Sequence, residues 1–107
     1  MPARDPSDRR PPGVNSDESL DVLVDRLFDH VEATGQLPID RQTSRWLGEA
    51  EAVARDVATN DLDEATIRRR VRQVNHLLEE AGRTDHKEAN RHLDAARGIC
   101  EIVLEDE

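Results

Sequence analysis

Apolar residues recur every three or four positions along most of the chain, and this spacing is typical of amphipathic helices. The first predicted helix carries Leu20, Leu23, Val24, Leu27, Phe28 and Val31 at this spacing. The pattern predicts helices at about residues 17–34, 41–58, 62–81 and 85–104, joined by short links. Four such helices favour an antiparallel four-helix bundle. We therefore expect an all-α fold, with the bundle spanning residues 16–107.

Residues that commonly begin or end helices stand at the predicted boundaries. Asp61, three residues before Glu64, resembles a capping box in which Asp replaces the usual Ser or Thr. The other predicted N-caps are Ser16 or Asp17, Asp40, and Thr84 or Asp85. Gly35 and Gly82 follow the first and third helices, where we expect each glycine to end its helix in a left-handed conformation.

The two halves of the predicted bundle resemble each other. Residues 45–57 lie over 91–103 when shifted by 46 positions, and Gly35 lies over Gly82 when the shift is 47. One interpretation is a duplication that gave two similar helical hairpins; the other is that any two amphipathic hairpins align this well. Two units are fewer than the three or so that a stacked solenoid needs, so a closed bundle is preferred.

Residues 1–15 differ from the rest of the chain. They contain four prolines, no aromatic residue and no apolar periodicity, which predicts a disordered N-terminal tail. Arg9 and Arg10 are followed by two prolines instead of the apolar run of a twin-arginine signal. No stretch approaches the ~18 apolar residues of a membrane span. We therefore expect a cytoplasmic protein that does not contact a membrane.

The charge balance adds an expectation about habitat. The 107 residues include 24 acidic and 15 basic residues, for a net charge of −9, and Lys87 is the single lysine. This composition resembles that of haloarchaeal proteomes, in which acidic surfaces stay hydrated at molar salt. A protein of a halophilic archaeon is the favoured interpretation. The alternative interpretation is a protein of a high-GC mesophile or a locally acidic binding module.

Four arginines are concentrated in the segment IRRRVRQVNHLL, residues 67–78. Arg68 and Arg72 are one turn apart on a helix and share a face, beside the apolar row. The first helix carries aspartates every four residues, at Asp17, Asp21, Asp25 and Asp29. If the first and third helices are neighbours, we expect the arginines to pair with this aspartate row.

Nucleic-acid binding is the alternative role for the arginines Arg68, Arg69 and Arg72, together with Arg4, Arg9 and Arg10 of the tail. Four phosphate contacts would weaken roughly 10⁴- to 10⁵-fold if the ionic strength rose about twentyfold toward molar salt. The acidic remainder of the surface also repels phosphate. We therefore expect nucleic acid not to be the partner, and a nucleic-acid-associated regulator remains the second hypothesis.

Catalytic and metal-binding patterns are weak. Glu88 and His92 are four residues apart, whereas di-iron bundles use Glu-x-x-His pairs, so we predict no metal and no cofactor. A metal-binding bundle that uses these two residues remains a further alternative. Cys100, the sole cysteine, lies in an apolar row, and buried thiols are inert. The chain is therefore expected not to be an enzyme.

The favoured function is a non-enzymatic protein-interaction or adaptor module. Trp46, the single tryptophan, lies near the start of the second helix, and Leu37 and Ile39 precede it. It is interpreted as a partial plug of the core or as an anchor for a partner, because aromatic residues dominate interface hot spots. The candidate partner-binding residues are Leu37, Ile39, Trp46, Arg68, Arg69 and Arg72. We expect the partner to be another protein, and the sequence also allows a homodimer.

Overall fold

The computed structural model describes residues 16–105, with side chains from Leu20 onward. It contains four helices: α2 (Ser16–Thr34), α3 (Arg41–Thr59), α4 (Glu64–Ala81) and α5 (Lys87–Glu105). No strand occurs in this part of the chain. The predicted all-α fold is confirmed, and each predicted helix boundary lies within two residues of the observed one. The predicted disordered tail, 1–15, and the predicted caps Ser16 and Asp17 lie outside the residues and side chains described.

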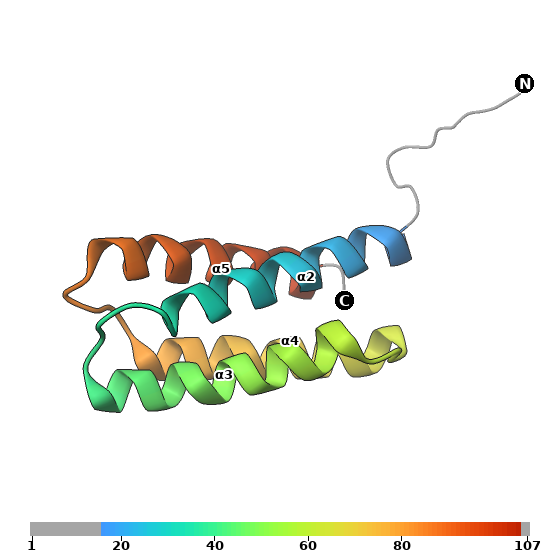
Figure 1. Ribbon diagram of the computed structural model, residues 1–107. Helices are drawn as coiled ribbons and strands as arrows, with labels where there is room; N and C mark the ends of the chain where they lie inside the picture. The colour runs from blue at the N-terminus through green and yellow to red at the C-terminus, as the bar shows by residue number, and fades with distance from the viewer. Residues whose placement is uncertain (1–15, 106–107) are drawn as a thin grey trace, which may run out of the picture.

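The helices form an antiparallel bundle in which each packs against two others (Figure 1). Helix α2 packs against α3 and α5, and α4 also packs against α3 and α5. The pairs α2/α4 and α3/α5 therefore lie across the diagonals of the bundle. The chain forms two hairpins, α2–α3 and α4–α5, as the sequence predicts, and their origin by duplication stays a prediction.

The centre of the bundle is aliphatic. Leucine, valine and alanine side chains from all four helices fill it, because their burial is favourable and leaves no polar group unpaired. The largest fully buried side chains are Leu27, Leu78, Leu93, Val31, Val71, Val74, Val103, Thr34 and Cys100. No helix of the described residues has the length and apolar character needed to cross a membrane.

The start of α3 agrees with the sequence prediction, and the start of α4 does not. Asp40 caps α3 by accepting a 3.0 Å hydrogen bond from the backbone N–H of Thr43. At α4 the cap is Asp63, which accepts a 2.7 Å bond from the N–H of Thr66, so the predicted Asp61–Glu64 box is wrong. Leu62, just before this cap, packs against the core that includes Ile67, four residues after the cap. This hydrophobic staple fixes the point where α4 begins.

The predicted caps of α5, Thr84 and Asp85, are also wrong. The backbone carbonyl of His86 accepts from the N–H of Asn90 at 3.0 Å, and its Nδ1 accepts from the N–H of Ala89 at 3.4 Å. His86 is therefore the residue that caps the helix. The hydroxyl of Thr84 accepts from the N–H of His86 at 2.9 Å, and its backbone is held by the side chain of Asn90. These contacts keep Thr84 in the link before α5.

The two helix-ending glycines behave differently. Gly82 has φ of +67°, a backbone region that favours glycine, and its N–H donates to the carbonyl of Leu78. Gly35 does not adopt positive φ, so the prediction is wrong there. Its N–H instead donates to the carbonyl of Glu32 in a tight turn, and the Thr34 hydroxyl donates to the carbonyl of Val31 at 2.6 Å. Local turns therefore end α2 without a left-handed residue.

Candidate functional site

Arg68, the first residue of the arginine block, is held inside the contact between α4 and α5. Its side chain is 13% exposed, pairs with Glu64 one turn earlier, and donates from Nε to the carbonyl oxygen of Val103 at 3.2 Å. That carbonyl lies in the last turn of α5, where backbone acceptors have no partner within their own helix. Arg68 is therefore a structural bond between two helices in this chain.

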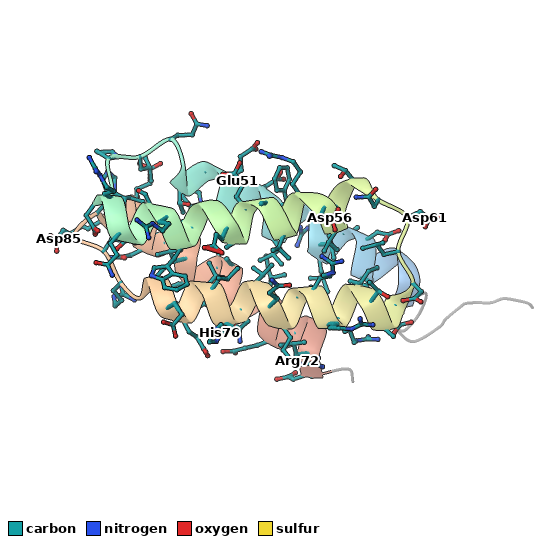
Figure 2. The ribbon with its side chains drawn as sticks, turned by 90° about the horizontal axis from the view of Figure 1, so that it is seen from below. Glu51, Asp56, Asp61, Arg72, His76 and Asp85 are labelled. Atoms are coloured by element: carbon teal, nitrogen blue, oxygen red, sulfur yellow. The ribbon has the colours of Figure 1, made fainter. Side chains whose placement is uncertain are left out.

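The other arginines of the block are directed to different sides of α4. Arg70 reaches α3, where it lies 3.5 Å from a carboxylate oxygen of Asp56. Arg69 is exposed near Asp63, and its charge contributes to lowering the pKa of that carboxyl, after the hydrogen bonds from Thr66. Arg72 is exposed on the outer side of α4, with His76 one turn further along (Figure 2). The block therefore forms no single continuous basic surface.

The predicted pairing of Arg68 and Arg72 with the aspartate row requires α2 and α4 to be neighbours, and they are diagonal instead. Asp21 and Asp25 face the end of α3, where they line an open cleft of about 390 Å³ together with Asp61. Asp17 lies among the side chains that are not described. The structure thus does not bring the two rows together, because the order of the helices around the bundle separates them.

The second predicted surface is only partly accessible. Leu37, Ile39 and Trp46 are all half-buried, and Ile39 and Trp46 pack against the hydrophobic core. The position of Trp46 fits the interpretation of a partial core plug. None of these observations tests partner binding, so the six candidate residues remain predictions.

His92 has a partner that the sequence analysis missed. Its Nδ1 lies 3.0 Å from Nδ1 of His30, across the contact between α2 and α5. The ring centroids are 5.3 Å apart, and both residues are half-buried. On the other side of the His92 ring, Nε2 lies 4.0 Å from a carboxylate oxygen of Glu88. The Glu88–His92 pair is thus extended by a second imidazole.

Among the described residues, no group of three or more His, Cys, Asp or Glu side chains is placed to hold a metal ion.

A usable sequence signal for the histidine pair was present. In an antiparallel pair the end of α2 faces the start of α5, and each histidine borders a buried residue, Val31 or Leu93.

A second feature of α2 and α5 is apolar. Val22 and Ile102 are the large hydrophobic side chains exposed in the described part of the chain, at 44% and 50%. Leu23 lies two turns before His30, and Ile99 lies two turns after His92, so helical periodicity places both on the side where α2 and α5 meet. Val22 and Ile102 lie on the same two helices, outside the buried stripe of each.

Charged residues adjoin these two side chains in the sequence, and two of them, Asp21 and Asp25, also line the cleft at the end of α3. We define the α2–α5 patch as Val22 and Ile102 together with the exposed charged neighbours Asp21, Asp25, Arg26, Glu101 and Glu105. Four of the five charged groups are acidic. The start of α2 and the end of α5 lie at the same end of the bundle, which brings these residues to one region (Figure 1).

Comparison with known proteins identifies a family. No curated protein and no solved structure matches the chain. Residues 23–107 match the model of a family described as "Domain of unknown function (DUF8152)". The match includes all of α3, α4 and α5 and most of α2, which is more than half of the chain. The chain therefore belongs to the DUF8152 family.

Proposed function

We propose that this protein is a non-enzymatic protein-interaction module that binds its partner through the α2–α5 patch. The observation that supports the proposal is the exposure of Val22 and Ile102 on two helices that pack side by side. Other large apolar side chains of the four helices are buried or half-buried. A contact that covers these two side chains removes apolar surface from water and gains free energy.

The charges around the patch favour a basic partner segment. Asp21, Asp25, Glu101 and Glu105 are exposed and lie within three residues of Val22 or Ile102 in the sequence, and Arg26 is the one basic residue of the patch. A segment that presents apolar side chains flanked by Arg or Lys would complement both features. A second copy of this chain would place carboxylates against carboxylates. We therefore propose that the partner is a different polypeptide. Homodimerisation through this face would contradict the proposal.

The proposed setting is the cytoplasm of a halophilic archaeon. The near absence of lysine and the net charge of −9 support this setting. At 1 M salt the screening length falls to about 3 Å, so only ion pairs in direct contact keep their strength. Burial of the apolar pair then supplies the attraction that persists, while the contacting charges select the partner.

A peptide of known sequence provides the test. The probe is an amphipathic helical peptide of leucine and arginine, compared with a version in which glutamate replaces arginine. Binding to the full chain is followed by amide chemical shifts in molar potassium chloride. We expect the arginine peptide to shift amides of α2 and α5 around Val22 and Ile102, and the glutamate peptide to bind at least about tenfold more weakly, a difference of about 1.4 kcal/mol.

Matched variants separate the patch from the rest of the surface. The double variant V22S/I102S should lose most of the affinity, because it removes the apolar anchors without changing charge. The control Q73S alters an exposed residue on α4, which is diagonal to α2, and should bind like the wild type. Equal affinity of V22S/I102S and wild type, or shifts centred on Arg69 and Arg72, would contradict the proposal.

A further inference from the structure

The rings of His30 and His92 meet head to head. Their Nδ1 atoms are 3.0 Å apart, and the centroid separation of 5.3 Å is about the sum of this distance and the two ring radii. The two Nδ1 atoms therefore lie close to the line that joins the rings, so each nitrogen directs its lone pair or its N–H at the other. This is the geometry of an N–H···N hydrogen bond that holds a single proton.

The hydrogen bond limits the protonation states of the pair. Two neutral imidazoles carry two ring protons on four nitrogens. One proton occupies the Nδ1–Nδ1 line, so one ring has the Nδ1–H tautomer and the other has the Nε2–H tautomer. A third proton can be added at the remaining Nε2 without disturbing the bond. A fourth proton would place N–H groups on both facing nitrogens, and the bond would be lost.

Glu88 determines which ring is the donor. Its carboxylate oxygen lies 4.0 Å from Nε2 of His92, so a proton on that nitrogen is favoured by the negative charge. His92 then accepts at Nδ1, and His30 donates its Nδ1–H. Nε2 of His30 carries the lone pair of the neutral state and takes up the third proton.

We propose that Glu88, His92 and His30 form a proton-operated latch that joins the end of α2 to the start of α5. The latch holds while the two rings carry two or three ring protons, and the third proton strengthens it because the donor becomes an imidazolium ion. The fourth proton opens it and leaves two adjacent positive charges. This inference does not depend on the proposed partner, because the latch lies toward the other end of the α2–α5 seam from Val22 and Ile102.

The charged groups near the pair come from the two helices that carry it. On α5 these are Glu88 and Arg91, four residues and one residue before His92, and on α2 they are Arg26 and Asp29. Helices α3 and α4 also pack against α2 and α5. Glu88 is therefore the acidic group that acts directly on the pair.

The tautomers provide the first test. Two-bond ¹H–¹⁵N correlation spectra of the full chain at about pH 8 distinguish Nδ1–H from Nε2–H rings, well above the free imidazole pKa of about 6.5. We expect the Nδ1–H tautomer at His30 and the Nε2–H tautomer at His92. His76, which lies exposed on α4, is the internal control and should show the Nε2–H form preferred by free histidine. Nε2–H tautomers at both His30 and His92 would exclude a shared proton and overturn the proposal.

The pH dependence of stability provides the second test. As the pH is lowered from about 7.5, the third proton should raise the midpoint temperature of unfolding of the wild type relative to H30Q/H92Q, and the fourth proton should then lower it. The double variant H30Q/H92Q has no titratable group at these positions, so its own profile should show neither change. The variant H76Q should behave like the wild type. Identical pH profiles for H30Q/H92Q and wild type would overturn the latch, whatever the absolute stability of the variant.

Discussion

Arg97 of α5 donates from Nη2 to the backbone carbonyl oxygen of Leu78 in α4, at 2.9 Å. The same nitrogen lies 3.0 Å from the carbonyl oxygen of Gly82, which follows α4. None of the four helices has a basic residue in its own last turn. Arg97 therefore supplies from a neighbouring helix the positive charge that a helix C-terminus favours. Arg68 of α4 does the same for Val103 of α5, so the two helices cap each other.

Removal of the Arg97 guanidinium should therefore destabilise the bundle. Its side chain is 23% exposed, and hydrogen bonds to charged groups contribute about 1.5–3 kcal/mol each. We expect R97Q to lower the free energy of unfolding by an amount in this range, measured by urea denaturation. The control R91Q changes an exposed arginine of the same helix and should stay within about 0.5 kcal/mol of the wild type. Equal effects of the two substitutions would show that Arg97 is not a cap.

Three glycines give predictions of opposite sign. Gly82 has φ of +67° and ψ of −152°, a region that is essentially restricted to glycine, so G82A should cost about 1–3 kcal/mol. Gly48 and Gly98 lie within helices, and a methyl group on either would meet no atom within 4 Å. G48A and G98A should each stabilise the protein by about 0.5–1 kcal/mol. Thermal unfolding of the three variants checks the signs, and a stabilising G82A would be inconsistent with the observed backbone.

The two aspartate caps predict a loss of stability in acid. The pKa of Asp40 is lowered by hydrogen bonds from the backbone and side chain of Thr43, and that of Asp63 by the side chain and backbone of Thr66. A carboxyl whose pKa is lower in the folded state stabilises the fold above its unfolded value of 3.8. This contribution is lost as the pH falls through the folded pKa.

Replacement of both caps by asparagine tests this contribution. Asparagine also accepts hydrogen bonds from the first turn of a helix but carries no charge in this pH range. D40N/D63N should therefore lose less stability than the wild type as the pH is lowered below about 4, measured by circular dichroism. D21N/D25N, which changes two exposed carboxylates outside the caps, is the control and should retain the wild-type slope. An equal loss of stability in acid for the wild type and both double variants would refute the role of the caps.

Cys100 should be unreactive in the folded protein. Burial, with a smaller contribution from the charge of Glu101, raises the pKa of the thiol to about 12. The nucleophilic thiolate is therefore scarce at pH 8, and the side chain is closed to solvent. A disulfide reagent such as Ellman's reagent should react slowly with the native chain and rapidly in denaturant. Fast, complete labelling under native conditions would contradict the buried position.

The sequence predicts the helices well because their apolar periodicity is local. It fails at boundaries decided by contacts made elsewhere: the Leu62 staple moves the start of α4 to Asp63, and the Thr84–Asn90 contacts leave His86 to cap α5. The order of helices around the bundle is also a tertiary property, which explains why the arginine block and the aspartate row were wrongly expected to meet.

The residues of the candidate site were harder to predict from the sequence than the helices. The meeting of His30 and His92 depends on the register of α2 against α5, across 62 positions of the chain. Val22 and Ile102 did offer a signal, because each is a large apolar residue outside the buried stripe of its helix. An apolar residue on the polar face of an amphipathic helix is a candidate contact residue even without an aromatic neighbour.

Site-specific photocrosslinking tests the central claim most directly. A benzophenone amino acid is placed at Val22, at Ile102 and, as a control, at Gln73 of the full chain, and the crosslink is formed at molar potassium chloride in the native host. The account predicts adducts with one other polypeptide from the first two positions and not from the third, with the attachment site beside arginine or lysine residues in the partner. Adducts of the chain with itself, adducts from Gln73 alone, or none from Val22 and Ile102 would contradict it.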